Sequence, residues 1–172
     1  AKSPYPLASS PSSETWAAIL QYPERDGSSE PAMLVWLGPN ATELPPHVHT
    51  HESEYFRTLR GEVTFVVEGE PHRLGPEEDV TIEPGSEHYF RNDTNEYVTF
   101  YAELPWIRTA ETQMTSFGMD HDGVFSSDGS YSEPDFIQGL LLSEYLREGT
   151  KITVAPFAVQ RLMWATVGRV AK

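Results

Sequence analysis

The sequence contains no cysteine. This absence excludes disulfide frameworks, zinc–thiolate sites, iron–sulfur clusters and cysteine nucleophiles. Basic residues are scarce as well: 12 Lys and Arg stand against 26 Asp and Glu, which gives the 172-residue chain a net charge of −14. Such a charge repels phosphate backbones and anionic lipids, so we expect neither nucleic acid nor a membrane as a partner.

Long apolar runs are also missing. No segment approaches the roughly 18 apolar residues that cross a bilayer, and the N-terminus shows no basic stretch followed by an apolar one. We therefore expect a cytoplasmic protein. Because 38% of the residues are hydrophobic and 12% are aromatic, the chain can bury a core, and its length suits one domain.

The stretch from residue 31 to residue 105 has the pattern of an antiparallel β domain. Short runs rich in Val, Phe, Tyr and Thr alternate there with Gly and Pro, which predicts a sandwich or a small barrel. Arg60-Gly61-Glu62 and Glu68-Gly69-Glu70 predict hairpin turns in which glycine takes the positive φ angle. The expected strands are Ala32–Leu37, Pro46–His49, Glu54–Leu59, Glu62–Glu68, His72–Leu74, Asp79–Glu83, His88–Asn92 and Glu96–Leu104.

The segments on either side of this β domain differ from it. Residues 1–30 predict an N-terminal arm with one strand or packing segment, Trp16–Leu20. Residues 106–172 predict a helical extension packed on the barrel. Apolar residues recur there at helical spacing over Glu133–Glu148 and over Pro156–Val170, and the second of these segments opens on a proline.

One cluster of residues has the pattern of a metal site. Three of the six histidines, His47, His49 and His51, fall within five residues, and Glu54 follows them. On an extended strand, residues i and i+2 point to the same face, so His47 and His49 project together. Glu54 opens the next expected strand, and His88 opens another. Neutral imidazoles with a carboxylate suit one divalent transition metal: Fe, Mn, Ni, Cu or Zn.

Two motifs in this region resemble a known family. The pattern His47-x-His49-x4-Glu54-x6-Gly61 is similar to the first motif of the cupin superfamily, and Pro84-Gly85-x2-His88-x3-Asn92 resembles the second. The resemblance covers about residues 32–104 and implies a mainly β fold, a double-stranded β-helix (jelly-roll) barrel with a metal near its mouth. It implies that the metal ligands are His47, His49, Glu54 and His88. Gly61 would then form a turn, and Asn92 would be structural near a strand end.

The chain departs from the family pattern in its turns. Glu77 stands where the second motif usually opens on glycine, and Glu83 stands where a proline is usual. Gly38 lies nine residues before His47, whereas the family's glycine lies six before the first histidine. These positions shape loops, so the departures concern loop geometry more than the ligand set.

Strand alternation also predicts the walls of the pocket. If Glu54 and His88 face inward, Phe56, Thr58 and Phe90 do so as well. An alternative is that these aromatic residues form the barrel core, and His51 fits a pocket position and a plain surface position equally. The predicted substrate-binding residues are His51, Phe56, Thr58, Phe90 and Tyr101.

The resemblance to quercetinase-type single-domain cupins implies a function. The residue that matches Glu54 is thought to act there as both ligand and base, which indicates a dioxygenase acting on a small aromatic or enolic compound. A non-redox decarboxylase, isomerase or cyclase is the alternative enzyme, and a non-catalytic small-molecule-binding cupin is the alternative of another class. Because cupin relatives are often dimers, we also expect a homodimer.

Overall fold

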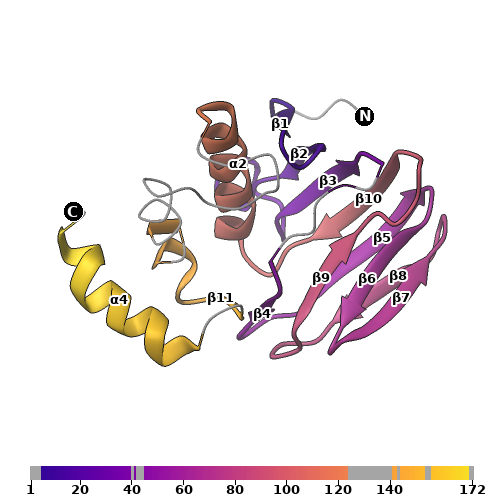
Figure 1. Cartoon of the computed structure of the whole chain (residues 1–172). Coiled ribbons are helices and arrows are strands. Elements are labelled where there is room, and N and C mark those ends of the chain that lie inside the picture. Colours follow the sequence, from indigo (N-terminus) through magenta and orange to yellow (C-terminus); the bar gives the residue numbers. More distant parts are fainter. Residues whose placement is uncertain are drawn as a thin grey trace.

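The computed structural model describes residues 5–39, 41, 45–123, 141–142, 144–153 and 156–170. Two antiparallel sheets face each other and enclose the core (Figure 1). Within the described residues, the larger sheet has the strand order β1-β2-β3-β10-β5-β8 and the smaller has the order β11-β4-β9-β6-β7. The bounds are β1 (Ala8–Ser10), β2 (Thr15–Gln21), β3 (Ala32–Leu37), β4 (His47–His49), β5 (Glu54–Arg60), β6 (Val63–Val67), β7 (Glu70–Leu74), β8 (Asp79–Ile82), β9 (His88–Arg91), β10 (Val98–Glu103) and β11 (Thr150–Ile152).

The strands expected between residues 31 and 105 are all present, from β3 to β10. The mainly β, jelly-roll prediction is therefore confirmed. The two predicted hairpin turns are present as well, with φ angles of 75° at Gly61 and 82° at Gly69. Gly61 is also sterically required, because a Cβ atom there would lie 2.7 Å from Cγ1 of Val98.

Phenylalanines from both sheets fill the space between them. Phe56 and Phe100 come from the larger sheet, and Phe65 and Phe90 come from the smaller one. Their ring centroids lie 4.7 to 6.1 Å apart, mostly in edge-to-face arrangements. Such pairs stabilise a core beyond the effect of burial alone. The interior next to the histidine cluster is therefore packed with aromatic rings.

The first thirty residues contribute two strands to the larger sheet, whereas the sequence predicted an arm with one strand or packing segment. β2 contains the predicted packing segment, pairs with β3 in register and places Trp16 opposite Trp36. β1 then pairs with β2 at the sheet edge. Because residues 16–20 are apolar on both strand faces, β2 extends the sheet beyond the boundary expected at residue 31.

The helices agree only in part with the sequence pattern. α4 (Phe157–Val170) matches the helix predicted to open at Pro156 and lies at one side of the molecule (Figure 1). The other predicted helix, Glu133–Glu148, lies largely outside the described residues. The sequence reading assigned no helix to residues 107–121, where the structure has α2 (Ile107–His121). A further short helix is α1 (Pro23–Asp26). Among the described helices, none is long and apolar enough to cross a membrane.

Candidate metal centre

The topology brings the four predicted ligands together. His47 lies directly opposite His88 where β4 pairs with β9, and His49 follows on the same face of β4. Glu54 opens β5 in the opposing sheet. One potential ligand atom from each of these four residues lies within 4.8 Å of the other three. Residues from two sheets therefore converge on one point between them.

The carboxylate of Glu54 is the centre of this cluster. Its Oε2 atom lies 3.1 Å from Nε2 of His49 and 2.9 Å from Nε2 of His88. All three side chains are at most 4% exposed. Polar groups this close together and this buried could share one cation.

In His47 and in His88, the Nδ1 atom forms a hydrogen bond with a backbone carbonyl oxygen. Nδ1 of His47 lies 3.0 Å from the carbonyl oxygen of Pro45, and Nδ1 of His88 lies 3.0 Å from that of Ser86. Since a carbonyl can only accept, both Nδ1 atoms carry the proton. The Nε2 lone pairs of neutral His47 and His88 are then free for a cation. Metal-binding histidines commonly have this arrangement.

The charges in the cluster also favour a bound cation. Burial alone would raise the pKa of Glu54, but hydrogen bonds from His49 and His88 outweigh it and lower the pKa to about 2. The carboxylate is thus ionised. A neutral His88 with its proton on Nδ1 would direct a lone pair at this anion, so the contact needs either a second proton on the ring or a cation between the groups. The donor set therefore fits a divalent transition metal.

His47 behaves differently from His88. Burial, followed by the charge of His88, lowers the pKa of His47 to about 4. For His88, burial would also lower the pKa, but the hydrogen bond to Glu54 and the charge of Glu54 raise it instead. Near neutral pH, His47 is therefore uncharged and has no proton to displace, whereas the raised pKa of His88 means that metal binding there would compete with a proton.

A cavity of about 190 Å³ lies beside this cluster. It is lined by His49, His51, Glu52, Pro105, Trp106, Glu148 and Gly149. His51 is exposed and lines this cavity. It is therefore both a surface residue and a pocket residue, the two alternatives that the sequence left open. The charged residues of the lining, Glu52 and Glu148, are acidic, and Trp106 contributes an aromatic wall.

A family comparison agrees with this geometry. Residues 33–102 match the family model described as a cupin domain. These residues form a cupin domain. A curated oxidoreductase of Arthrobotrys oligospora is 29% identical over 99 residues, which cover 55% of this chain and 36% of that relative. The chain thus spans about a third of the length of the curated relative it matches.

Solved structures with similar folds carry several activities in their names. A sugar phosphate isomerase of the cupin superfamily from Silicibacter pomeroyi is 24% identical, with a TM-score of 0.47 over 58% of this chain and 65% of that one. The polyketide cyclase RemF from Streptomyces resistomycificus is 21% identical, with a TM-score of 0.49 over 66% of this chain and 93% of that one.

The predicted pocket residues divide into two groups within the cupin fold. Phe56, Thr58 and Phe90 face inward as expected and are 2%, 0% and 7% exposed. Phe56 and Phe90 pack against the other core rings, and Oγ1 of Thr58 has no hydrogen-bond partner among the described residues. They form the floor below the cluster, and contact with a substrate remains a prediction for them.

Tyr101 differs from the expectation. Phe100 and Ala102, its neighbours on β10, are 0% and 1% exposed and face the core. Because side chains alternate along a strand, Tyr101 lies on the outer face, where its hydroxyl donates to Glu103. The Tyr101 side chain therefore points away from the metal-ligand cluster.

Sequence reasoning missed the contribution of the C-terminal segment. β11 pairs with β4, which places Thr150 opposite His49, and Oγ1 of Thr150 lies 2.9 Å from Nδ1 of His49. Gly149 packs so closely on Trp106 that a Cβ atom there would lie 2.5 Å from the indole ring. The β-branched residues Thr150, Ile152 and Thr153 were the available signal for a strand.

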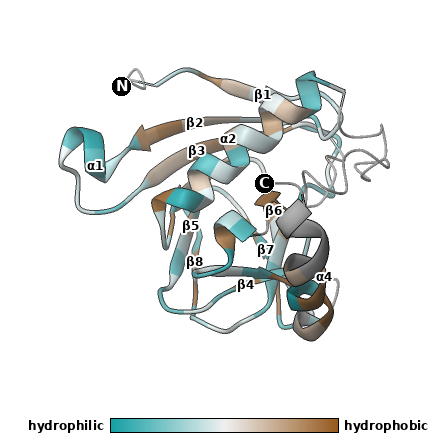
Figure 2. Ribbon diagram, turned by 90° about the vertical axis from the view of Figure 1, so that its left-hand side faces the viewer, coloured by the Kyte–Doolittle hydropathy of each residue, from teal (hydrophilic) through white to brown (hydrophobic). Residues whose placement is uncertain are grey.

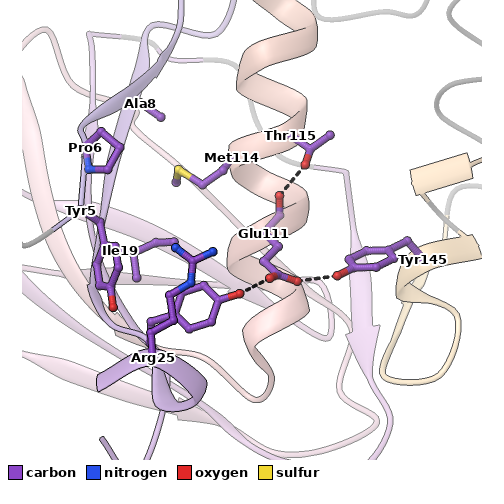
Figure 3. Close-up of a pocket in the computed structure, with 10 residues that line it drawn as sticks. Tyr5, Pro6, Ala8, Ile19, Arg25, Glu111, Met114, Thr115 and Tyr145 are labelled. Carbon is purple, nitrogen blue, oxygen red and sulfur yellow. Dashed lines mark hydrogen bonds between the residues drawn. The ribbon is translucent and has the colours of Figure 1, made fainter. Parts of the chain in front are cut away.

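A second cavity, of about 510 Å³, lies between the N-terminal strands and α2 (Figure 3). The carboxylate of Glu111 on α2 accepts hydrogen bonds there from the hydroxyls of Tyr22 and Tyr145. The bond to Glu111 raises the pKa of Tyr22 to about 12. Arg108 stacks on Tyr145 and on Trp106. These contacts hold the segment before β11 against α2. They thereby stabilise the wall of the cavity beside His49, which includes Trp106 and Gly149.

Proposed function

We propose that this cupin binds one divalent transition metal through His47, His49, Glu54 and His88 and is an enzyme acting on a small aromatic or enolic compound. The supporting observation is the convergence of three imidazoles and one ionised carboxylate in a buried cluster. Dioxygenation is the reaction that we put first. It agrees with the resemblance of the ligand motif to quercetinase-type cupins and with the oxidoreductase name of the curated relative.

Glu54 has a second role in this proposal, as the group that accepts a proton from the substrate. When bound, the metal would lower the pKa of an enol or phenol hydroxyl and present the substrate to dioxygen. Nε2 of His49 and Nε2 of His88 would hold the metal, and the carboxylate of Glu54 beside them would take and keep the proton of the substrate hydroxyl. A carboxylate with a pKa this low accepts a proton only from a donor that is itself made strongly acidic.

The cavity beside His49 supports the choice of substrate class. Its rim carries the carboxylates of Glu52 and Glu148, and the chain has a net charge of −14. A phosphate or carboxylate substrate would be repelled there. The indole of Trp106 offers an apolar, planar wall. An uncharged planar compound therefore fits this opening better than a sugar phosphate.

A non-redox reaction is the second candidate, because the same ligand set can polarise a carbonyl without any electron transfer. The cyclase and isomerase names among the fold relatives are the reason to test it. A non-catalytic role, in which the metal only orders the barrel and the cavity holds a ligand, is the third.

The test loads the metal-free protein separately with Fe(II), Mn(II), Ni(II), Cu(II) and Zn(II) and offers a flavonol and an enolisable 1,3-diketone. Oxygen uptake with a redox metal, lost in Glu54→Gln and retained in the rim control Glu52→Gln, supports the dioxygenase. Product formation under strict anaerobiosis with Zn(II) overturns it in favour of non-redox chemistry. Binding of either compound without turnover under any condition supports the binding role.

A further inference from the structure

The second cavity is separate from the metal centre and is large enough for a ligand. Its volume of about 510 Å³ lies within the range of about 300 to 1,000 Å³ that is usual for small-molecule pockets. None of its described lining residues belongs to the histidine cluster or to the cavity beside His49. Its walls come from the N-terminal strands, α1 and α2, together with Tyr145 (Figure 3).

The lining combines apolar surface with two opposite charges. Ile19 of β2 and Met114 of α2 supply apolar side chains. In Figure 2, hydrophilic α1 (teal) follows the hydrophobic end of β2 (brown), and this short helix brings the guanidinium of Arg25 to the cavity. α2 brings the carboxylate of Glu111. A cation and an anion therefore border the same space.

The side chain of Tyr22 separates these two charges. The guanidinium of Arg25 lies 4.5 Å from the centroid of the Tyr22 ring, and the hydroxyl of that ring donates to Glu111. Within the part of the chain that the structure describes, neither Arg25 nor Glu111 forms an ion pair. Because a guanidinium stacks with its face and donates from its edge, the stacked Arg25 can still bind a carboxylate.

The charges of the lining restrict the kind of ligand. Burial would raise the pKa of Glu111, but hydrogen bonds from Tyr145 and Tyr22 outweigh it and lower the pKa, so the carboxylate is ionised. It would repel a simple anion, and the net charge of −14 adds to this repulsion. Arg25 would in turn repel a simple cation. A ligand that carries one charge of each sign avoids both conflicts.

The hydroxyls around Glu111 act toward a ligand as acceptors. Tyr22 and Tyr145 donate their protons to the Glu111 carboxylate, and Thr115 donates to the Glu111 carbonyl oxygen. A hydroxyl whose proton is used in this way still has lone pairs that can accept. Together with the carboxylate, these oxygens favour a ligand group with several N–H donors, and an ammonium group has three.

We propose that the second cavity binds an α-amino acid with an apolar side chain. The carboxylate of the amino acid would pair with the guanidinium of Arg25, and its ammonium group would donate to Glu111 and to the oxygen of Tyr22. The apolar side chain would lie against Ile19 and Met114. A purely structural contact between Glu111 and the tyrosines explains neither a cavity of this size nor the guanidinium beside it. The proposal does not depend on the proposed enzymatic function.

Isothermal titration calorimetry of the full chain with L-leucine and L-phenylalanine measures this binding directly. The matched amines, 3-methylbutylamine and 2-phenylethylamine, lack the carboxylate, and the matched acids, 4-methylpentanoate and 3-phenylpropanoate, lack the ammonium group. Each analogue should bind at least tenfold more weakly than its amino acid. The absence of binding by both amino acids at about 10 mM overturns the proposal. So does an analogue that binds as tightly as its amino acid.

Two variants locate the site. Glu111→Gln and Arg25→Gln each remove one of the two charges and should weaken amino-acid binding at least tenfold. Circular dichroism and thermal unfolding establish that each variant is folded. Arg25 is exposed, so Arg25→Gln decides the test alone if Glu111→Gln does not fold. Wild-type affinity in either folded variant overturns the proposal, and it is the result expected if the amino acid binds at the metal centre instead.

Glu62→Gln and Arg73→Gln are the matched controls. They make the same two changes of charge at exposed positions outside the cavity. Both should bind the amino acid with wild-type affinity. A tenfold loss in these controls as well would show a general effect of charge and would overturn the assignment of the site.

Discussion

The hydroxyl of Thr150 lies 2.9 Å from Nδ1 of His49 and joins the C-terminal strand to a proposed metal ligand. The two residues are 101 positions apart in the chain. They meet because β11 adds to the edge of the smaller sheet beside β4. The segment after residue 105 therefore takes part in the construction of the site.

Replacement of Thr150 tests this relationship. Thr150→Val keeps the β-branched shape but removes the oxygen that orients His49, so metal affinity should fall about 10- to 100-fold. Competition titration with a chromogenic chelator measures the change. Thr153→Val is the control, because Oγ1 of Thr153 donates to the carbonyl of Pro46 and to no histidine. Equal affinity in wild type and Thr150→Val would contradict the positioning role.

Glu77 carries the backbone conformation that the family motif assigns to glycine. Its φ angle is 71°, in the left-handed region that costs a residue with a Cβ atom about 1 kcal/mol or more. Glu77→Gly should therefore raise the free energy of unfolding by about 1 kcal/mol, measured by urea denaturation.

Glu77→Ala separates this backbone effect from the ion pair that Glu77 forms with Arg57. It removes the same carboxylate but keeps the Cβ atom, and exposed pairs of this kind contribute little. Glu77→Ala should be no more stable than wild type. A gain from Glu77→Ala as large as that from Glu77→Gly would show that backbone strain is not the cause.

The close contact between Gly149 and Trp106 gives a pair of opposite predictions. Gly149→Ala forces the indole or β11 to move, and overpacking of this kind typically costs about 1 to 3 kcal/mol. Gly118→Ala, on α2 with open space around the new methyl group, should stabilise by about 0.5 to 1 kcal/mol through helix propensity. Thermal unfolding of both variants compares them. A neutral Gly149→Ala would contradict the close packing of this segment.

The stability of the metal-free protein should depend on pH through His47. Burial and the charge of His88 lower its pKa to about 4 in the folded chain, from an ordinary value of 6.5. Between these values the unfolded chain binds a proton that the folded chain does not. The contribution is therefore complete above pH 6.5 and is lost as the pH falls to about 4, by no more than about 3 kcal/mol.

Urea titrations of the chelator-treated protein from pH 7.5 to pH 4 measure this dependence. Glu54 and His88 titrate in both proteins, so the difference between wild type and His47→Gln isolates the histidine. Wild type should lose more stability than His47→Gln over this range. Parallel curves would show that His47 is not held uncharged in the folded chain.

The sequence predicted the barrel well because its signal is local. Alternating apolar residues and turn glycines such as Gly61 and Gly69 define strands and hairpins within a few residues of each other. The ligand cluster was also predictable, since His47 and His49 share a strand face and the two motifs supply Glu54 and His88.

The missed parts depend on contacts between distant segments. α2 carries Ile107, Ala110, Met114 and Phe117 at helical spacing, a signal that was available but weaker than the strand pattern before it. The strand pairing of β11 and the partner of His49 depend on the tertiary arrangement. The outward position of Tyr101 required knowing which face of β10 meets the core, which is given by the burial of Phe100.

Elemental analysis of the purified protein tests the central claim most directly, with wild type beside His47→Ala and His88→Ala. We predict close to one transition-metal equivalent per wild-type chain and a large loss in both variants, while the exposed-histidine control His72→Ala keeps the full amount. A redox metal would direct the first assays to oxygen uptake, and zinc would direct them to anaerobic turnover. A wild-type chain that contains no metal and does not take up added Fe(II), Mn(II), Ni(II), Cu(II) or Zn(II) would contradict the account.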